Sequence, residues 1–223
     1  MKIMGLDTSR KLSEVSILDT ATKMLVTETC MEKNNESLLR MIDGALKRAG
    51  CRLPDIDLIG ASVGPGSFTG LRIGLTTVKT FSQLLNIPVI GVGTFAAMAQ
   101  TADFEGTVLI DARGGRVYYG DAKKIDDEAR QRSGPRTTQM ASLIPELRET
   151  VLVLESESVQ QALEAAGIQV QVLEKDAMIS PAVAQLALSR YEHGEHGHWT
   201  ALQPEYVGVS QAERELEQKQ CRH

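Results

Sequence analysis

The feature that most constrains the fold of this chain is a glycine-rich segment at residues 64–74, which reads Gly-Pro-Gly-Ser-Phe-Thr-Gly-Leu-Arg-Ile-Gly. The apolar run before it, 57–63, predicts a buried strand, and apolar residues recur at helical spacing over 71–85 after it. Glycine permits backbone angles that other residues resist, so the chain can turn tightly between the two elements. The sequence therefore predicts a strand, a glycine loop and a helix in immediate succession.

The glycine loop has two interpretations, a phosphate-binding loop or a structural turn into a closely packed helix. A helix start attracts anions because its first N–H groups lack partners and the helix dipole is positive there. Two nucleotide motifs do not fit: a P-loop needs a lysine directly after Gly70, and the dinucleotide fingerprint needs its third glycine one residue earlier. Ser67 and Thr69 offer hydroxyl groups that can cap the helix. The residues of the candidate loop are Gly64, Gly66, Ser67, Thr69, Gly70 and Arg72.

Two predicted helices are candidates for an interface. Gly70, Gly74 and Thr77 share one face of the helix after the loop, and small residues there let another backbone approach closely. An earlier helix, expected over 36–49, has an apolar stripe wider than a single narrow seam. Each face can pack against the chain's own sheet or against a partner protein. The apolar candidates on the earlier helix are Leu38, Leu39, Ile42 and Leu46.

The composition is that of a globular protein that can bury a proper core. A length of 223 residues allows one domain or two small ones. The net charge of −5 gives no electrostatic footprint for nucleic acid, so a partner would supply the positive surface if RNA is involved. Three cysteines without a CxxC pair suit a reducing compartment, and we expect neither a signal peptide nor a membrane span. The expected location is the cytoplasm.

A weak internal repeat divides the chain. A strand at 3–6 ends at Asp7 and opens an antiparallel meander, and a later strand ends in the same way at Asp111 before a turn and a returning strand. This repeat predicts an α/β protein with two related halves, 1–103 and 104–223. The C-terminal tail is expected to pack back on the first half.

The second half is less regular than the first. The segment 123–138 is charged and is expected to be irregular and exposed. Short apolar runs and helix stop signals predict the remaining elements. These are strands at 151–154 and 169–173, helices at 159–166 and 181–191, an extended stretch at 203–207, and a helix or frayed tail at 211–218.

Taken together, these motifs resemble the TsaB (YeaZ) family of bacterial threonylcarbamoyladenosine biosynthesis. The resemblance covers most of the chain, is strongest over residues 1–120 and includes a Pro-Glu-Tyr element at 204–206. It implies an actin-like ATPase fold of the sugar kinase and Hsp70 type, with two related lobes. The segments that carry it are 3–8, 64–74, 87–92 and 111–118.

The resemblance also implies a role through partners. TsaB-like proteins pair through two helices with TsaD, a paralogue that transfers the threonylcarbamoyl group to the adenosine beside the tRNA anticodon. The ATPase TsaE joins the pair, and TsaC makes the donor. We therefore expect a non-catalytic activator subunit that meets tRNA only through the complex, with ATP or ADP at the complex interface. A homodimer is the alternative for the isolated chain, and a glycoprotease-like peptidase or an independent actin-like ATPase or kinase is the alternative function.

The resemblance implies neither a catalytic residue nor a metal site in this chain. TsaD-like proteins carry a metal-binding pair of histidines, and the matching positions here are Thr94 and Met98, which are poor ligands for such a metal. Asp7, Thr8 and Ser9 stand where actin-like ATPases place their first phosphate loop. The glycine that usually follows the aspartate is missing here, which predicts a vestigial loop and no cofactor held by this chain alone.

Two polar clusters have open interpretations. The first, at 193–198, is either a zinc site or an exposed helix end, because histidine also favours the C-terminal end of the helix dipole. The second, at 113–116, is either an anion contact or a solvated turn. The residues are His193, His196, His198 and Glu195 in the first cluster and Arg113 and Arg116 in the second.

Overall fold

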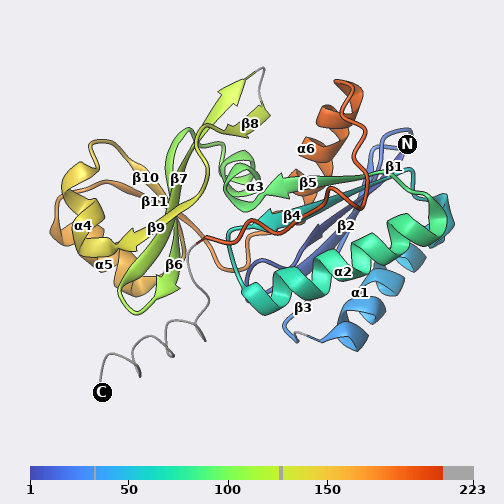
Figure 1. Cartoon of the computed structure of the whole chain (residues 1–223), viewed down its shortest axis with the longest axis horizontal. Helices are drawn as coiled ribbons and strands as arrows, with labels where there is room; N and C mark the ends of the chain where they lie inside the picture. Colours follow the sequence, from blue (N-terminus) through green and yellow to red (C-terminus); the bar gives the residue numbers. More distant parts are fainter. Residues whose placement is uncertain (33, 126–127, 208–223) are drawn as a thin grey trace.

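The computed structural model describes residues 1–32, 34–125 and 128–207, and it contains two mixed β-sheets with helices packed around them (Figure 1). The first sheet has the strand order β3-β2-β1-β4-β5. Its first three strands form the predicted antiparallel meander, and β4 and β5 continue in parallel from β1. The strands are β1 Lys2–Asp7, β2 Ser13–Asp19, β3 Met24–Cys30, β4 Leu58–Gly64 and β5 Val89–Gly93.

The second sheet repeats this arrangement. Its strand order is β11-β10-β6-β7-β8, in which an antiparallel meander is again followed by two parallel strands, and β9 pairs with β7. The shared order confirms two related lobes. The boundary at 103/104 stays a prediction, and it falls between α3 and β6. The strands are β6 Gly106–Arg113, β7 Arg116–Ile125, β8 Glu128–Gln131, β9 Arg136–Gln139, β10 Val151–Leu154 and β11 Val170–Leu173.

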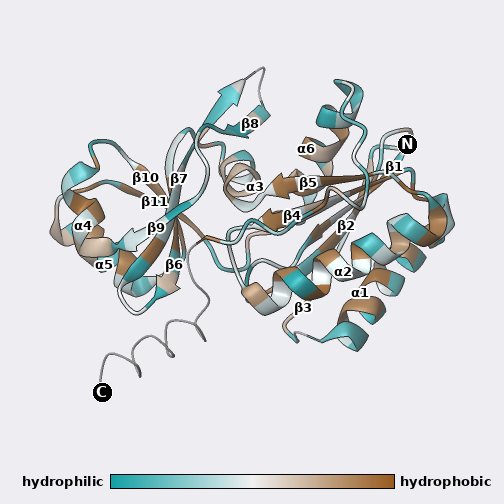
Figure 2. Ribbon diagram, viewed as in Figure 1, coloured by the Kyte–Doolittle hydropathy of each residue, from teal (hydrophilic) through white to brown (hydrophobic). Residues whose placement is uncertain are grey.

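Helices cover both faces of the first sheet. Figure 1 shows α1 and α2 side by side on one face, where they enclose a core with the side chains of β1 and β4. On the other face, α3 and α6 fill a second core that continues to the strands of the second sheet. Figure 2 shows the hydrophobic colouring gathered on the central strands, whereas α1 and α2 carry both polar and hydrophobic residues. The helices are α1 Asn35–Arg48, α2 Phe68–Leu85, α3 Thr94–Thr101, α4 Met140–Leu143, α5 Glu157–Ala165 and α6 Ser180–Glu192, with 3-10 turns at Leu53–Asp55 and Ile144–Glu146.

The helix ends follow the sequence signals. The side chain of Asn34 accepts a hydrogen bond from the Ser37 N–H at the start of α1, and Ser67 does the same for Gly70 at the start of α2. Thr69, the other predicted cap, lies inside α2 instead. Asn86 ends α2 in the left-handed conformation, with φ of 54°.

The last described helix, α6, returns to the first sheet. Its backbone lies so close to the strands that a Cβ atom at Gly5 would collide with Ser180 O, and one at Gly60 would lie 2.7 Å from Val183 O. Because any larger residue would push α6 away, glycine is needed at both positions. The residues after α6 continue across the first sheet, where the Val89 N–H donates to Gly197 O at 3.2 Å.

The prediction of an irregular segment at 123–138 is wrong. Strand β7 extends to residue 125, and β8 and β9 pair with it. Ala122 and Ala129 are buried, whereas the residues that follow them, Lys123 and Arg130, are exposed. This alternation is the period of a strand with one buried face, and the number of charges concealed it. The stretch at 203–207 has no regular secondary structure, and the tail predicted at 211–218 lies outside the described residues.

Two glycine substitutions test the packing of α6 on the first sheet. Alanine should lower the stability at Gly5, which faces α6, and raise it at Gly44, which lies elsewhere. Gly5→Ala should destabilise the protein by about 1–3 kcal/mol, because the added methyl group overlaps backbone atoms of α6. Gly44→Ala should stabilise it by up to about 1 kcal/mol, because Gly44 lies inside α1 and an added Cβ there would be 3.9 Å from the nearest side chain. Urea denaturation of both variants measures the difference, and a Gly5→Ala protein as stable as wild type would contradict the packing.

Candidate functional site

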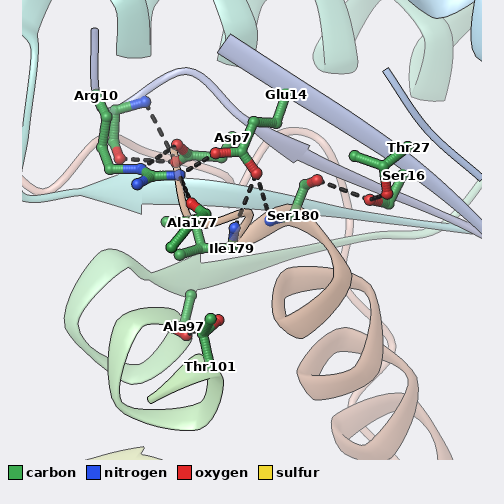
Figure 3. Close-up of polar contacts among 11 residues, drawn as sticks. Asp7, Arg10, Glu14, Ser16, Thr27, Ala97, Thr101, Ala177, Ile179 and Ser180 are labelled. Atoms are coloured by element: carbon green, nitrogen blue, oxygen red, sulfur yellow. Dashed lines mark hydrogen bonds and ion pairs between the residues drawn. The ribbon is translucent and has the colours of Figure 1, made fainter. Parts of the chain in front are cut away.

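A buried cluster of charges lies where β1 turns into β2, at the position predicted to hold a vestigial phosphate loop. It joins the end of β1, the start of β2 and the N-terminus of α6 (Figure 3). Asp7, Ser9, Arg10 and Glu14 are each no more than 5% exposed. Charged groups are seldom buried unless they are paired, so the contacts within this cluster decide what the site can do.

The turn is held by Asp7 and Arg10. Asp7 Oδ1 accepts hydrogen bonds from the Ser9 N–H at 3.2 Å and from Ser9 Oγ at 2.7 Å. Asp7 Oδ2 lies 3.5 Å from Arg10 Nε, while Arg10 Nη2 pairs with Glu14 Oε1 and donates to Ala177 O at 2.7 Å. One guanidinium group therefore bridges two carboxylates and the segment that leads into α6.

Glu14 also fastens the first turn of α6. Its Oε2 accepts hydrogen bonds from the N–H groups of Ile179 at 2.8 Å and Ser180 at 3.0 Å. A carboxylate is favoured at this end of a helix because it faces free N–H groups and the positive end of the dipole. Beside it, Ser16 Oγ lies 2.7 Å from Ser180 Oγ, which ties β2 to the same turn of α6. The cluster thus connects α6 to the first two strands.

The protonation of Glu14 is shifted by its surroundings. Burial and, after it, the Asp7 carboxylate raise the pKa of Glu14 from 4.5 to about 7, although Arg10 and the two backbone N–H groups act in the opposite direction. Desolvation is the main cause, because burial disfavours the ionised form of the carboxyl group, and the nearby Asp7 carboxylate adds repulsion. Arg10 Nη1, also buried, has no hydrogen-bond partner.

The turn after β1 packs directly against the glycine loop, so the structure brings these two predicted sites together. The Ser67 N–H donates to Ser9 O at 2.6 Å. A Cβ atom at Gly66 would overlap Ser9 O, and one at Gly74 would overlap Thr8 Oγ1. The glycines at 66 and 74 therefore let α2 and its loop approach the turn, which is the structural interpretation of the motif.

The C-terminal segment covers the other side of the glycine loop. Gly64 has a φ of 122°, a conformation that favours glycine, and a Cβ atom there would lie 2.9 Å from Glu205 O. The Glu205 N–H donates to Val63 O at 2.7 Å. Burial raises the pKa of Glu205, with Arg190 acting in the opposite direction. The remaining loop residues, Thr69 and Arg72, are exposed on the outer surface of α2.

The predicted partner surface needs a correction. Leu38, Ile42 and Leu46 are at most 7% exposed and pack into this chain's own core, so they do not line an outer surface. Gly70 and Gly74 are buried as well. An amphipathic helix gains most of its stability from such burial. The apolar stripe of α1 therefore packs against the chain's own sheet and is not available to a partner.

The outer surface of these helices is formed by other side chains. Leu39 is 47% exposed on α1, and Thr77 on α2 is half-buried, with its hydroxyl group donating to Ile73 O. The two helices together present an outward face. On α2, the side chains of this face are mainly small or uncharged. The exposed residues of α2 are Phe68, Thr69, Arg72, Thr76, Thr80, Gln83, Leu84 and Leu85.

The positions matched to a metal-binding histidine pair, Thr94 and Met98, are fully buried in the core around α3. Within the described ranges, no group of three or more His, Cys, Asp or Glu residues is placed to hold a metal ion. Thr94 Oγ1 and the nearby strand residue Ser62 each have a buried hydroxyl group without a hydrogen-bond partner.

The two polar clusters left open by the sequence lie apart from the buried charges. In the first, Glu195 is paired with Arg190, His193 contacts Ser189 O at 2.8 Å, and His196 meets the edge of the Tyr191 ring, as expected of an exposed helix end. In the second, the Arg113 N–H donates to Asp111 Oδ1 at 2.7 Å. This bond matches the one from Ser9 to Asp7, so the repeat extends to the turns after β1 and β6.

Sequence reasoning missed Arg10 and Glu14. A signal was present, since two opposite charges flank a short turn whose neighbouring strands are apolar. The third element, the N-terminus of α6, lies more than 160 residues further along the chain, and no local pattern shows that it closes the cluster.

In the described part of the chain, no helix has both the length and the apolar character needed to cross a membrane.

Two lobes with the same strand order, in which an antiparallel meander is followed by two parallel strands, are the architecture of the actin-like ATPase fold. A model of the family described as TsaD, tRNA N6-adenosine threonylcarbamoyltransferase, matches residues 24–215. The chain belongs to this family, on its TsaB (YeaZ) branch.

The relatives on this branch are similar in both sequence and structure. The tRNA threonylcarbamoyladenosine biosynthesis protein TsaB of Escherichia coli (strain K12) is 32% identical over 132 residues, 57% of each chain. That of Bacillus subtilis (strain 168) is 32% identical over 124 residues, 54% of each chain. The structure of YeaZ from Pseudomonas aeruginosa superimposes with a TM-score of 0.76 at 23% identity, covering 92% of this chain and 99% of that one. The chain spans a little over half the length of the curated relatives it matches.

The raised pKa of Glu14 predicts a pH-dependent stability. The folded state retains a proton that the unfolded chain releases above pH 4.5, so the contribution of Glu14 to stability is present below pH 4.5 and is lost as the pH rises to about 7. Glu14→Gln removes this titration. The stability difference between wild type and Glu14→Gln should therefore change across this window, with a slope of at most about 1.4 kcal/mol per pH unit.

Urea denaturation between pH 4.5 and 8 measures this difference. Glu36→Gln, at an exposed residue in the first turn of α1, is the matched control and should keep a constant difference from wild type. A Glu14→Gln curve parallel to that of wild type would contradict the shifted pKa.

Proposed function

We propose that this chain is a non-catalytic partner subunit for threonylcarbamoyl transfer to the adenosine beside the tRNA anticodon, and that it acts through a TsaD-like paralogue. The observation that carries the proposal is the buried cluster of Asp7, Arg10 and Glu14. The family resemblance implies the phosphate loop of an ATPase at this turn, and here Asp7 and Glu14 already pair with Arg10, the cation in the turn. A phosphate entering it would be repelled by the buried Asp7 carboxylate, and by that of Glu14 whenever it is ionised.

The environment of Thr94 and Met98 supports the same conclusion. Both side chains are enclosed in an apolar core at the start of α3, in place of the histidine pair of TsaD-like proteins. Neither a hydroxyl group nor a thioether in such a core suits a hard or borderline divalent metal. Transfer chemistry is therefore assigned to the paralogue.

The partner surface is proposed to be the outward face of α1 and α2. Because the inward faces are occupied by the chain's own sheet, only the outer residues remain for a partner. Leu39 is 47% exposed and Leu84 75% exposed, and the exposed threonines of α2 are small enough for close helix packing. A paralogue with helices of the same shape fits this face, and a second copy of this chain would compete for it.

The remaining parts of the proposal concern the complex. A TsaE-like ATPase joins it, and ATP or ADP is held at the complex interface rather than by this chain alone. Transfer RNA meets this chain only through the complex, in keeping with a net charge of −5, which disfavours binding to a polyanion.

Reconstitution tests the proposed function. The TsaD-, TsaE- and TsaC-like proteins of the same organism are mixed with ATP, threonine, bicarbonate and unmodified tRNA, and modified adenosines are counted with and without this chain. We expect modification to depend on the chain, and we expect no transfer when the TsaD-like protein is left out. Equal modification without the chain, or transfer by the chain alone, would contradict the proposal.

A further inference from the structure

Two exposed aromatic rings flank an arginine at the start of α2. The rings of Phe68 and Tyr206 have centroids 4.8 Å apart. Arg72 Cζ lies 3.9 Å from the centroid of the Phe68 ring and 5.8 Å from that of Tyr206, and Arg72 Nε donates to the Tyr206 hydroxyl oxygen at 2.9 Å. We call Phe68, Arg72 and Tyr206 the aromatic–arginine cluster.

The exposure of this cluster is unusual for the chain. The sequence contains only four Phe and four Tyr, yet Phe68 is 40% exposed and Tyr206 48% exposed at the same place. Among the described residues, no other Phe, Tyr or Trp is exposed to this extent. Aromatic rings beside an arginine at the surface are the residue types that dominate the affinity of protein interfaces.

The guanidinium group of Arg72 is held in place but not neutralised. Stacking on Phe68 and the hydrogen bond to Tyr206 fix its plane, which lowers the entropy that it would lose on binding. In the described ranges, no carboxylate forms an ion pair with Arg72, although most other arginines there have one. Helix α2 itself has no Asp or Glu, so the charge has no counterpart on its own element.

The chain builds this cluster from distant parts of its sequence. Tyr206 lies 134 positions after Arg72 and is brought there by the C-terminal segment. That segment is anchored by buried Leu202 and by the hydrogen bond from the Glu205 N–H to Val63 O. Because the backbone on both sides of the contact is fixed, the cluster is part of the folded surface rather than a chance meeting of two flexible side chains.

We propose that the aromatic–arginine cluster is the anchor for a carboxylate of the TsaD-like partner, at the loop end of the α1–α2 face. A carboxylate is the group complementary to this site, because a pre-oriented guanidinium without an ion pair among the described residues binds a carboxylate through two parallel hydrogen bonds beside the two aromatic rings. The inference rests on the proposed function, since it names a contact of the same interface. It adds that the C-terminal segment, through Tyr206, sets the orientation of that contact.

Titration of the chain with the TsaD-like protein tests the anchor. Arg72→Ala should weaken binding about tenfold or more, and Arg72→Lys should recover only part of the loss, because lysine has the charge but not the planar fork. Tyr206→Phe, which keeps the ring and removes the hydroxyl acceptor, should weaken binding less than Arg72→Ala. The salt dependence of binding should decrease in Arg72→Ala, since an ion pair is lost.

The second lobe offers a matched control. Arg136 lies 4.6 Å from the Tyr119 ring centroid and is likewise exposed, so Arg136→Ala removes a similar arginine–aromatic contact away from the proposed face. Arg136→Ala should bind as wild type does, and thermal denaturation should show that all variants remain folded.

Each outcome decides a different claim. If wild type binds the TsaD-like protein and Arg72→Ala binds equally well, the anchor is wrong while the proposed function stands. If Arg72→Ala alters only self-association, measured by sedimentation, the cluster serves a second copy and the inference is overturned. If wild type does not bind the TsaD-like protein at all, the proposed function fails, and the anchor fails with it.

Discussion

The interaction on which the rest of the structure depends is the bridge that Arg10 makes between Asp7 and Glu14. It closes the turn between β1 and β2. Glu14 also accepts hydrogen bonds from the N–H groups at the start of α6, so the same bridge holds that helix. Breaking such a bridge leaves an uncompensated buried charge, which costs several kcal/mol, so the three parts are held as a unit. The last described helix thereby becomes part of the first lobe.

The glycine motif is best understood from this turn. Its glycines let the loop and α2 lie against Thr8 and Ser9 with almost no space between the backbones. The position of α2 is therefore set by the charge cluster beneath it, and the outward face of α2 is set in turn. A continuous series of contacts leads from Glu14 through the turn to the helix proposed to meet the partner.

Much of the fold could be predicted from the sequence because its signals are local. The meander, the caps at Asn34 and Ser67, the stop at Asn86 and the repeat ending at Asp111 all depend on residues close together in the chain. Strands β8 and β9 were missed because charged and polar residues dominate both: β8 has one buried residue, Ala129, and β9 has none.

The candidate site was predicted only in part. Asp7, Thr8, Ser9 and the loop glycines were found, and the structure brings them together. The two closing elements, α6 at Glu14 and the C-terminal segment at Arg72, come from sequence positions far away, and a periodic pattern does not show which helix face meets a sheet. For the same reason Leu38, Ile42 and Leu46 looked available to a partner, although the chain's own core takes them.

The central claim is that Asp7, Arg10 and Glu14 pair with one another in the turn after β1, and that this turn is therefore not a nucleotide site. Equilibrium dialysis of the isolated protein against labelled ATP with Mg²⁺ tests it most directly. The account predicts no saturable binding at millimolar ATP by the isolated protein, and a complex with its TsaD-like partner that does bind nucleotide. Stoichiometric binding by the isolated wild-type chain that is lost in Arg10→Ala would contradict it, because the guanidinium would then serve a phosphate rather than Asp7 and Glu14.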